Sequence, residues 1–126
     1  ASLLLSTVLA AAPPRKPAPA PPWLRGMTLR QKIAQLVVPV VFGDNPSSRS
    51  ADNKKYLRWV KDIGVGGLIV ANRVNSNGLV VNAQPYEMVT FINRMQKAAR
   101  VPLLMSADFE RGASMRVAGT VRFPYP

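Results

Sequence analysis

The stretch Gly64-Val65-Gly66-Gly67-Leu68-Ile69-Val70-Ala71 (GVGGLIVA) decides the fold of this chain. Its second part, residues 66–71, carries no polar side chain, which is typical of a strand buried on both faces of a sheet. Gly64 fits the left-handed residue that commonly ends a helix. A phosphate-binding G-x-G-x-x-G loop follows a strand and opens a helix, whereas these glycines follow a helix and precede a strand. We therefore interpret them as a tight turn into a buried strand.

Helices and strands alternate along the chain on both sides of this strand. A capping box at Thr28-Leu29-Arg30-Gln31 opens the first helix, and a turn at Asn77-Gly78 interrupts the polar loop 72–84. In chain order the expected elements are a helix that opens at Thr28 and is ended by Pro39, a strand at 38–42, a helix at 51–62, a strand at 66–71, a helix beginning at Pro85 and a strand at 101–107. This order predicts an α/β fold with a parallel sheet and right-handed crossovers.

Apolar residues at helical spacing predict the buried side of each helix. Trp59 falls beside the second of these stripes, and the spacing alone leaves its burial open. The expected buried residues are Leu29, Ile33, Leu36 and Val37 in the first helix, Tyr56, Leu57, Val60 and Ile63 in the second, and Met88, Phe91, Ile92 and Met95 in the third.

The composition excludes several kinds of site. The 126 residues include no Cys and no His, so disulfides, thiolate chemistry, Ser-His-Asp triads and imidazole metal ligands are absent from this chain. The net charge of +11 is typical of nucleic-acid binders. The positive residues are dispersed over the polar faces of helices, however, and only Lys54-Lys55 with Arg58 form a local cluster. We expect no nucleic-acid partner and keep a basic nucleic-acid binder as the third hypothesis.

The first 22 residues form a separate unit in this interpretation. Residues 1–12 are a short apolar run that ends in small residues, and residues 13–22 contain six prolines. This pattern is typical of a secretory signal followed by an extended linker, although it lacks an initiator Met and a basic start; a disordered apolar tail is the alternative. The run is too short to span a membrane. We expect a secreted or periplasmic protein whose folded part is residues 23–126.

Polar residues follow each expected strand, at Gly43-Asp44, Asn72-Arg73 and residues 108–111. The carboxyl ends of parallel strands carry the chemistry in such folds. Asp108 and Glu110 would leave the same face if the strand continued, and the nearby arginines could pair with them. Two neighbouring carboxylates approach a substrate from one side, so they suit ligands of sugar hydroxyls better than an acid–base pair. A salt-bridged loop without any ligand is the alternative.

Several motifs in order resemble the start of family 3 glycoside hydrolases, especially β-N-acetylhexosaminidases and related β-glucosidases. They are MTLRQKIAQL, GVGGLIV, FINRMQ and VPLLMSADFERGASMRV, followed by a closing FP, and they cover about residues 27–124. The most specific of them is D-x-E-x-G at Asp108, Glu110 and Gly112, with Arg116 at the expected distance. Arg111 replaces the first glycine of the family's common D-x-E-G-G pattern.

The resemblance implies a (β/α)8 TIM-type barrel, of which this chain holds about three strands, and the chemistry of a retaining exo-β-glycosidase. It implies that Asp108 binds sugar hydroxyls, that Arg116 helps to hold the substrate and that Glu110 supports the loop. The sugar would be a β-linked glucose or N-acetylglucosamine, and no cofactor or metal is expected.

The resemblance also places the nucleophile and the acid/base downstream of this chain, so we assign no catalytic residue here. We expect an N-terminal fragment that is inactive on its own and marginally stable. A non-catalytic carbohydrate-binding or structural α/β module is the alternative.

Overall fold

A computed structural model describes residues 19–124 of the chain. The signal-like run and most of the proline-rich stretch lie outside the described residues. Helix α1 (Pro22–Arg25) begins at the last residue of that stretch. No helix in the described part of the chain is long and apolar enough to cross a membrane.

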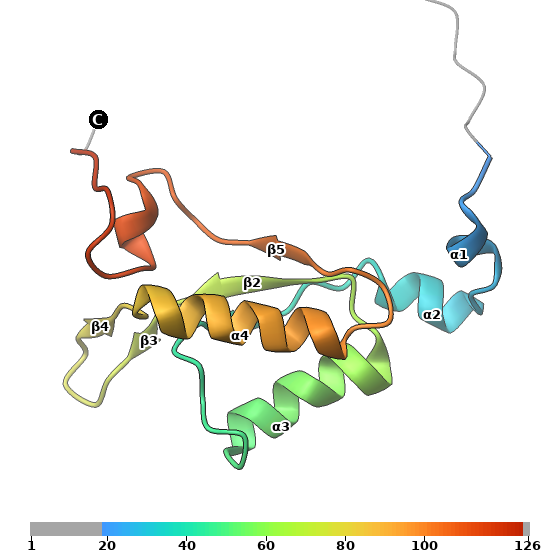
Figure 1. The fold of residues 1–126 in the computed structure, drawn as a ribbon, viewed down its shortest axis with the longest axis horizontal. Coiled ribbons are helices and arrows are strands. Elements are labelled where there is room, and N and C mark those ends of the chain that lie inside the picture. Colours follow the sequence, from blue (N-terminus) through green and yellow to red (C-terminus); the bar gives the residue numbers. More distant parts are fainter. Residues whose placement is uncertain (1–18, 125–126) are drawn as a thin grey trace, which may run out of the picture.

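Three short strands form a parallel sheet at the centre of the molecule (Figure 1). They are β1 (Val40–Phe42), β2 (Gly67–Ala71) and β5 (Leu104–Ser106), in the order β1-β2-β5. In the register of the sheet Val40 lies opposite Ile69, and Ile69 lies opposite Ser106. The prediction of a mixed α/β fold with a parallel sheet is confirmed to this extent.

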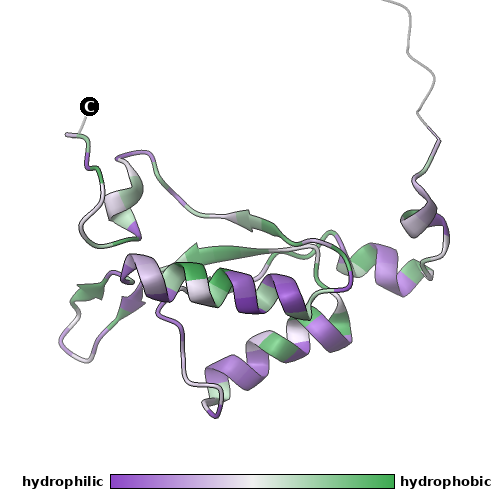
Figure 2. Ribbon diagram, in the orientation of Figure 1, coloured by the Kyte–Doolittle hydropathy of each residue, from purple (hydrophilic) through white to green (hydrophobic). Residues whose placement is uncertain are grey.

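Helices α3 (Ala51–Arg58) and α4 (Pro85–Ala98) contribute Tyr56, Met88, Phe91 and Met95 to the core that packs on the sheet. Figure 2 shows hydrophilic and hydrophobic residues alternating along both helices, while β2 is hydrophobic. Of the predicted apolar residues of α3, its π-helical continuation and α4, only Ile63 is exposed. Most of the predicted stripes on these helices are therefore confirmed. The buried core consists of Val41, Tyr56, Val60, Val65, Leu68, Val70, Ala83, Met88, Phe91, Met95 and Leu103.

The other face of the sheet is not covered by the described part of the chain. Leu68 and Val70 of β2 are buried, but Ile69 between them is only half-buried. On the neighbouring strands Val40 is exposed and Leu104 is 66% exposed. The expectation of a strand buried on both faces is therefore wrong here, because both long helices pack on the same side.

Helix α2 (Leu29–Ala34) has the predicted capping box, with Thr28 and Gln31 bonded reciprocally. It ends before the expected residue, because the chain tightens into i→i+3 hydrogen bonds after Ala34. The predicted buried stripe is wrong for this helix, since only Ala34 is buried and no described element packs over its apolar side. The stripe residues Leu29, Ile33, Leu36 and Val37 are all exposed.

The turn into β2 is confirmed in detail. Helix α3 continues into a π-helical turn, Trp59–Ile63, and Gly64 ends it with a left-handed backbone at φ 76°. A Cβ on Gly66 would collide with the backbone of Gln35. Trp59 is half-buried against Tyr56, with 5.6 Å between ring centroids, whereas Ile63 is exposed, contrary to the prediction.

The polar loop after β2 contains a small hairpin that the sequence did not predict. Strands β3 (Arg73–Val74) and β4 (Val80–Val81) pair antiparallel around the predicted turn, in which Gly78 has φ 76°. The segment after β5 forms a short 3-10 helix, Ala113–Met115. Both features lie next to the carboxyl end of the sheet.

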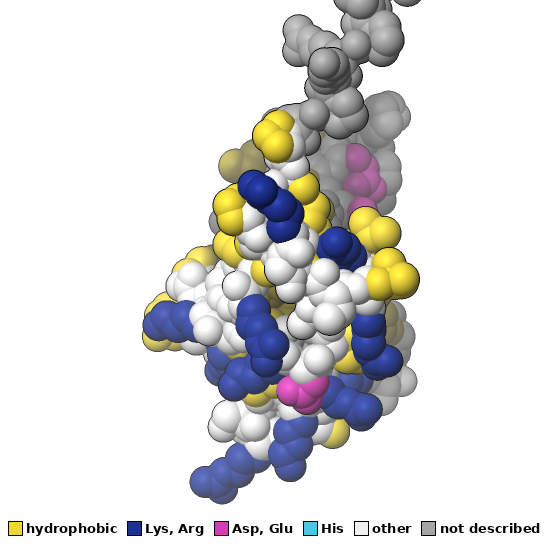
Figure 3. Space-filling model, turned by 90° about the vertical axis from the view of Figure 1, so that its right-hand side faces the viewer, with side chains coloured by type: hydrophobic (Ala, Val, Ile, Leu, Met, Phe, Trp, Pro, Cys, Tyr) yellow, Lys and Arg dark blue, Asp and Glu magenta, His cyan; other side chains and the backbone are white. Residues whose placement is uncertain are grey.

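The positive charge is dispersed, as predicted. On the face shown in Figure 3, Lys and Arg side chains are spread among hydrophobic ones. Within the cluster on α3, Lys55 is bound to Asp52 at 3.4 Å and lies over the rings of Tyr56 and Trp59.

Candidate functional site

The carboxyl ends of the three parallel strands hold two charged groups of residues. Asp44 follows β1, Arg73 lies in β3 shortly after β2, and Asp108 follows β5. The sequence predicted polar residues at all three strand ends. The structure pairs Asp44 with Arg73 and pairs Asp108 with Arg116.

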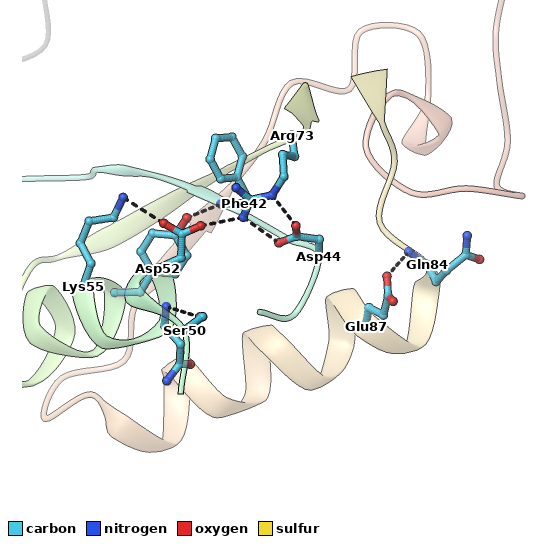
Figure 4. Close-up of polar contacts among 10 residues, drawn as sticks. Phe42, Asp44, Ser50, Asp52, Lys55, Arg73, Gln84 and Glu87 are labelled. Atoms are coloured by element: carbon cyan, nitrogen blue, oxygen red, sulfur yellow. Dashed lines mark hydrogen bonds and ion pairs between the residues drawn. The ribbon is translucent and has the colours of Figure 1, made fainter. Parts of the chain in front are cut away.

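Arg73 is the centre of the first group (Figure 4). Its Nε donates to Asp44 Oδ2 at 2.6 Å, and its Nη2 donates to Asp52 Oδ2 at 2.7 Å. The guanidinium also lies 4.4 Å from the centre of the Phe42 ring. This group was not predicted, because Asp52 is on a helix 21 residues away from Arg73.

The charges of this group stabilise one another. The hydrogen bond from Arg73 is the main reason why the pKa of Asp52 is lowered, and Lys55 contributes as well. The hydrogen bonds from Asp44 and Asp52 in turn raise the pKa of Arg73. Since Arg73 occupies both carboxylates, this group ties the loop after β1 to β3 and suits a structural role better than acid–base catalysis.

Asp108 and Arg116 form the second group. Arg116 Nη2 donates to Asp108 Oδ2 at 2.7 Å, which confirms that the two residues can pair. The side chain of Asp108 is 70% exposed, whereas that of Arg116 is 16% exposed. Arg116 also donates from Nη1 to the carbonyl of Met115 at 3.0 Å. A fixed cation thus holds an accessible carboxylate in place.

Glu110 does not share the strand geometry of Asp108. Strand β5 ends at Ser106, and the chain then turns, with the N–H of Gly112 donating to the carbonyl of Phe109 at 2.8 Å. Gly112 has φ 87°, and a Cβ there would collide with the carbonyl of Val121. The condition for two carboxylates on one strand face is therefore not met. No ion pair within residues 19–124 involves Glu110.

Two asparagines, Asn72 at the end of β2 and Asn82 after β4, hold the segment that carries Arg116. Asn72 donates to Asn82 Oδ1 at 2.6 Å and to the carbonyl of Met115 at 2.7 Å. Asn82 donates to the carbonyl of Ser114 at 2.7 Å. The Met115 carbonyl therefore accepts from both Asn72 and Arg116, which links the end of β2 to the second group. The sequence predicted a polar residue at Asn72, after the second strand, whereas it assigned Asn82 only to a polar loop.

A hollow of about 470 Å³ lies beside this link. Its lining includes Asn72 and Asn82 from one side and the segment from Arg111 to Arg122 from the other. Among the described residues, no group of three or more Asp or Glu side chains could hold a metal ion. The site can therefore offer hydrogen bonds and charge to a ligand.

This arrangement defines an α/β domain that presents polar groups at the carboxyl ends of parallel strands, where such folds bind their ligands. The model of the family described as Glycosyl hydrolase family 3 N terminal domain matches residues 28–126. The chain belongs to this family, which confirms the resemblance drawn from its motifs. A comparison with curated proteins gives no match.

Proposed function

We propose that this chain forms the substrate side of a retaining exo-β-glycosidase built on a (β/α)8 barrel. The observation that carries the proposal is the Asp108–Arg116 pair at the end of β5, in a chain of the glycosyl hydrolase family 3. Its substrate would be a β-N-acetylglucosaminide or a β-glucoside. The apolar and proline-rich first 22 residues support secretion or export to the periplasm.

In this proposal Asp108 accepts hydrogen bonds from sugar hydroxyls. Its exposure leaves carboxylate lone pairs accessible to a ligand, while Arg116 fixes the orientation of the group. Because Asn72 and Arg116 share the Met115 carbonyl, the hydrogen-bond network holds Arg116 in position before a ligand arrives. Pre-organised polar groups lose less entropy on binding than mobile ones.

The 126-residue chain alone is expected to be inactive. Retaining glycosidases use two carboxyl groups about 5–5.5 Å apart, one as nucleophile and one as acid/base. In the described residues, Asp44 and Asp52 are bound to Arg73, and Glu87 caps α4 through the N–H of Gln84, as Figure 4 shows. The nucleophile and the acid/base would lie outside this chain. The same observation favours a non-catalytic carbohydrate-binding module as the second candidate.

The test is a titration of the purified chain with N-acetylglucosamine and with glucose, followed by NMR. We expect Asp108→Asn to weaken binding at least about tenfold, since a hydrogen bond to a charged group contributes about 1.5–3 kcal/mol. Asp62→Asn is the matched control, because Asp62 is an exposed carboxylate near the opposite end of β2.

Unchanged binding by Asp108→Asn would contradict the role of Asp108. Hydrolysis of a nitrophenyl β-N-acetylglucosaminide by the chain, absent from the Asp108→Asn variant, would contradict the expected inactivity.

A further inference from the structure

The hollow beside Asn72 is unusually rich in arginine. Arg111, Arg116 and Arg122 all line it, and the lining within residues 19–124 includes no Asp or Glu. The three arginines come from one short segment after β5, which also turns sharply at Gly112. The hollow is therefore a local concentration of guanidinium groups, separate from the lysine-containing cluster on α3.

Two of these arginines keep hydrogen-bonding capacity that the described residues do not use. Arg116 donates from Nη2 to Asp108 and from Nη1 to the carbonyl of Met115, but its Nε is buried without a hydrogen-bond partner among the described residues. The exposed side chain of Arg122 has no hydrogen bond or ion pair within the described part of the chain. Buried donors without partners are rare in folded proteins, so the unused Nε is an observation in favour of a ligand.

The lining also favours a sugar-sized ligand over a nucleic acid. A hollow of about 470 Å³ lies within the usual range of about 300–1,000 Å³ for small-molecule sites. None of the described residues that line it is aromatic, whereas single-stranded nucleic acids are held mainly by bases stacked on aromatic rings. The hydroxyl of Ser114 and the amides of Asn72 and Asn82 add polar groups that suit sugar hydroxyls.

We propose that this hollow binds an anionic substituent of the carbohydrate, so that the substrate is a β-glucoside or β-N-acetylglucosaminide that carries an acidic group. This inference rests on the proposed function. Guanidinium groups form paired hydrogen bonds with the oxygens of carboxylate, sulfate and phosphate. Arg111, which stands where the family's common pattern has glycine, adds a positive charge at this site.

The experiment compares four ligands on the 126-residue chain at constant ionic strength: glucose, glucuronate, glucose 6-sulfate and glucose 6-phosphate. Inorganic sulfate serves as a fifth probe. We expect at least one acidic sugar to bind at least tenfold more tightly than glucose, and Arg122→Gln to remove most of this preference. Arg30→Gln is the matched control, because it removes one charge from an exposed position on α2, outside the hollow.

Each outcome separates the two proposals. Equal binding of glucose and all acidic sugars would overturn the acidic-sugar inference and leave the proposed function standing. A preference that both arginine variants reduce equally would show general attraction to the net charge and would also overturn it. A third outcome is that inorganic sulfate binds as tightly as the acidic sugars, that only Arg122→Gln loses this binding, and that glucose does not bind. This result would support the anion site and contradict carbohydrate recognition. Failure of every probe to bind would overturn both.

Discussion

Tyr56 connects the hydrophobic core to the end of β1. Its ring packs edge-on against Phe91, with 5.9 Å between centroids, and its hydroxyl accepts a hydrogen bond from the N–H of Phe42 at 3.2 Å. Phe42 in turn stacks on the guanidinium of Arg73. Burial of the hydroxyl raises the pKa of Tyr56. One side chain therefore couples packing, a backbone hydrogen bond and the charged group at the strand ends.

We expect Tyr56→Phe to lower the free energy of unfolding by about 1 kcal/mol at neutral pH, because the Phe42 N–H loses its acceptor. The pH dependence of the free energy of unfolding also changes. A raised pKa in the folded state means that the wild type keeps its full stability below the unfolded value of about 10 and loses stability as pH rises through the folded value. Tyr56→Phe does not show this loss of stability, because it has no phenol hydroxyl at position 56. Urea unfolding at pH 8 and at pH 11 measures both effects.

Tyr86 provides the control for this prediction, since its side chain is 80% exposed. Tyr86→Phe is expected to change neither the stability at neutral pH nor its decrease at alkaline pH. If the free energy of unfolding falls equally from pH 8 to pH 11 in the wild type and in Tyr56→Phe, the buried phenol does not titrate with unfolding and the prediction is wrong.

At the scale of elements, the turn into β2 joins α2 to the sheet. The N–H of Gly66 donates to the carbonyls of Ala34 and Val37, at 3.2 and 3.1 Å. The Nε2 of Gln35 donates to the carbonyl of Gly64 at 2.8 Å. This close approach of two backbones leaves no space for a side chain at Gly66, and it holds an otherwise exposed helix against the rest of the fold.

Gly66→Ala is expected to destabilise the protein by about 1–3 kcal/mol, as overpacking of a tight contact does. The Cβ would meet the backbone of Gln35, which cannot rotate away as a flexible side chain would. Gly26→Ala is the control, since no atom lies within 4 Å of its added Cβ. Thermal unfolding of both variants tests this, and equal melting temperatures would contradict the close approach.

The sequence predicted those elements whose cause is local. Apolar spacing and the glycine at position 64 predict the helices, the strands of the parallel sheet and the turn into β2. The hairpin and the π-helical turn were missed, because strands of two residues and one extra residue in a helical turn leave no periodic signal. At the site, Asp108 and Arg116 are eight residues apart, and the sequence indicated that the nearby arginines could pair with Asp108 or Glu110. The bond from Asn72 to Met115 spans 43 residues, and nothing in the sequence indicated it.

For the whole molecule, the important feature is apolar surface that the described residues leave uncovered. The stripe on α2 is exposed along its length, and Leu36 is 82% exposed. One face of the sheet is exposed at Val40 and Leu104 as well. Large exposed apolar patches promote association, and both outer strands of the sheet have an unpaired edge within the described residues. We therefore expect a marginally stable chain that self-associates.

The double variant Ile33→Lys, Leu36→Lys tests this expectation. Because both side chains are already exposed, the free energy of unfolding is expected to change by less than about 0.5 kcal/mol, while ANS fluorescence and association in sedimentation velocity decrease. The buried Leu68→Ala is the contrasting variant and is expected to lose about 2–5 kcal/mol. If the double variant unfolds as readily as Leu68→Ala, the α2 stripe is part of the core in solution and the surface is not exposed.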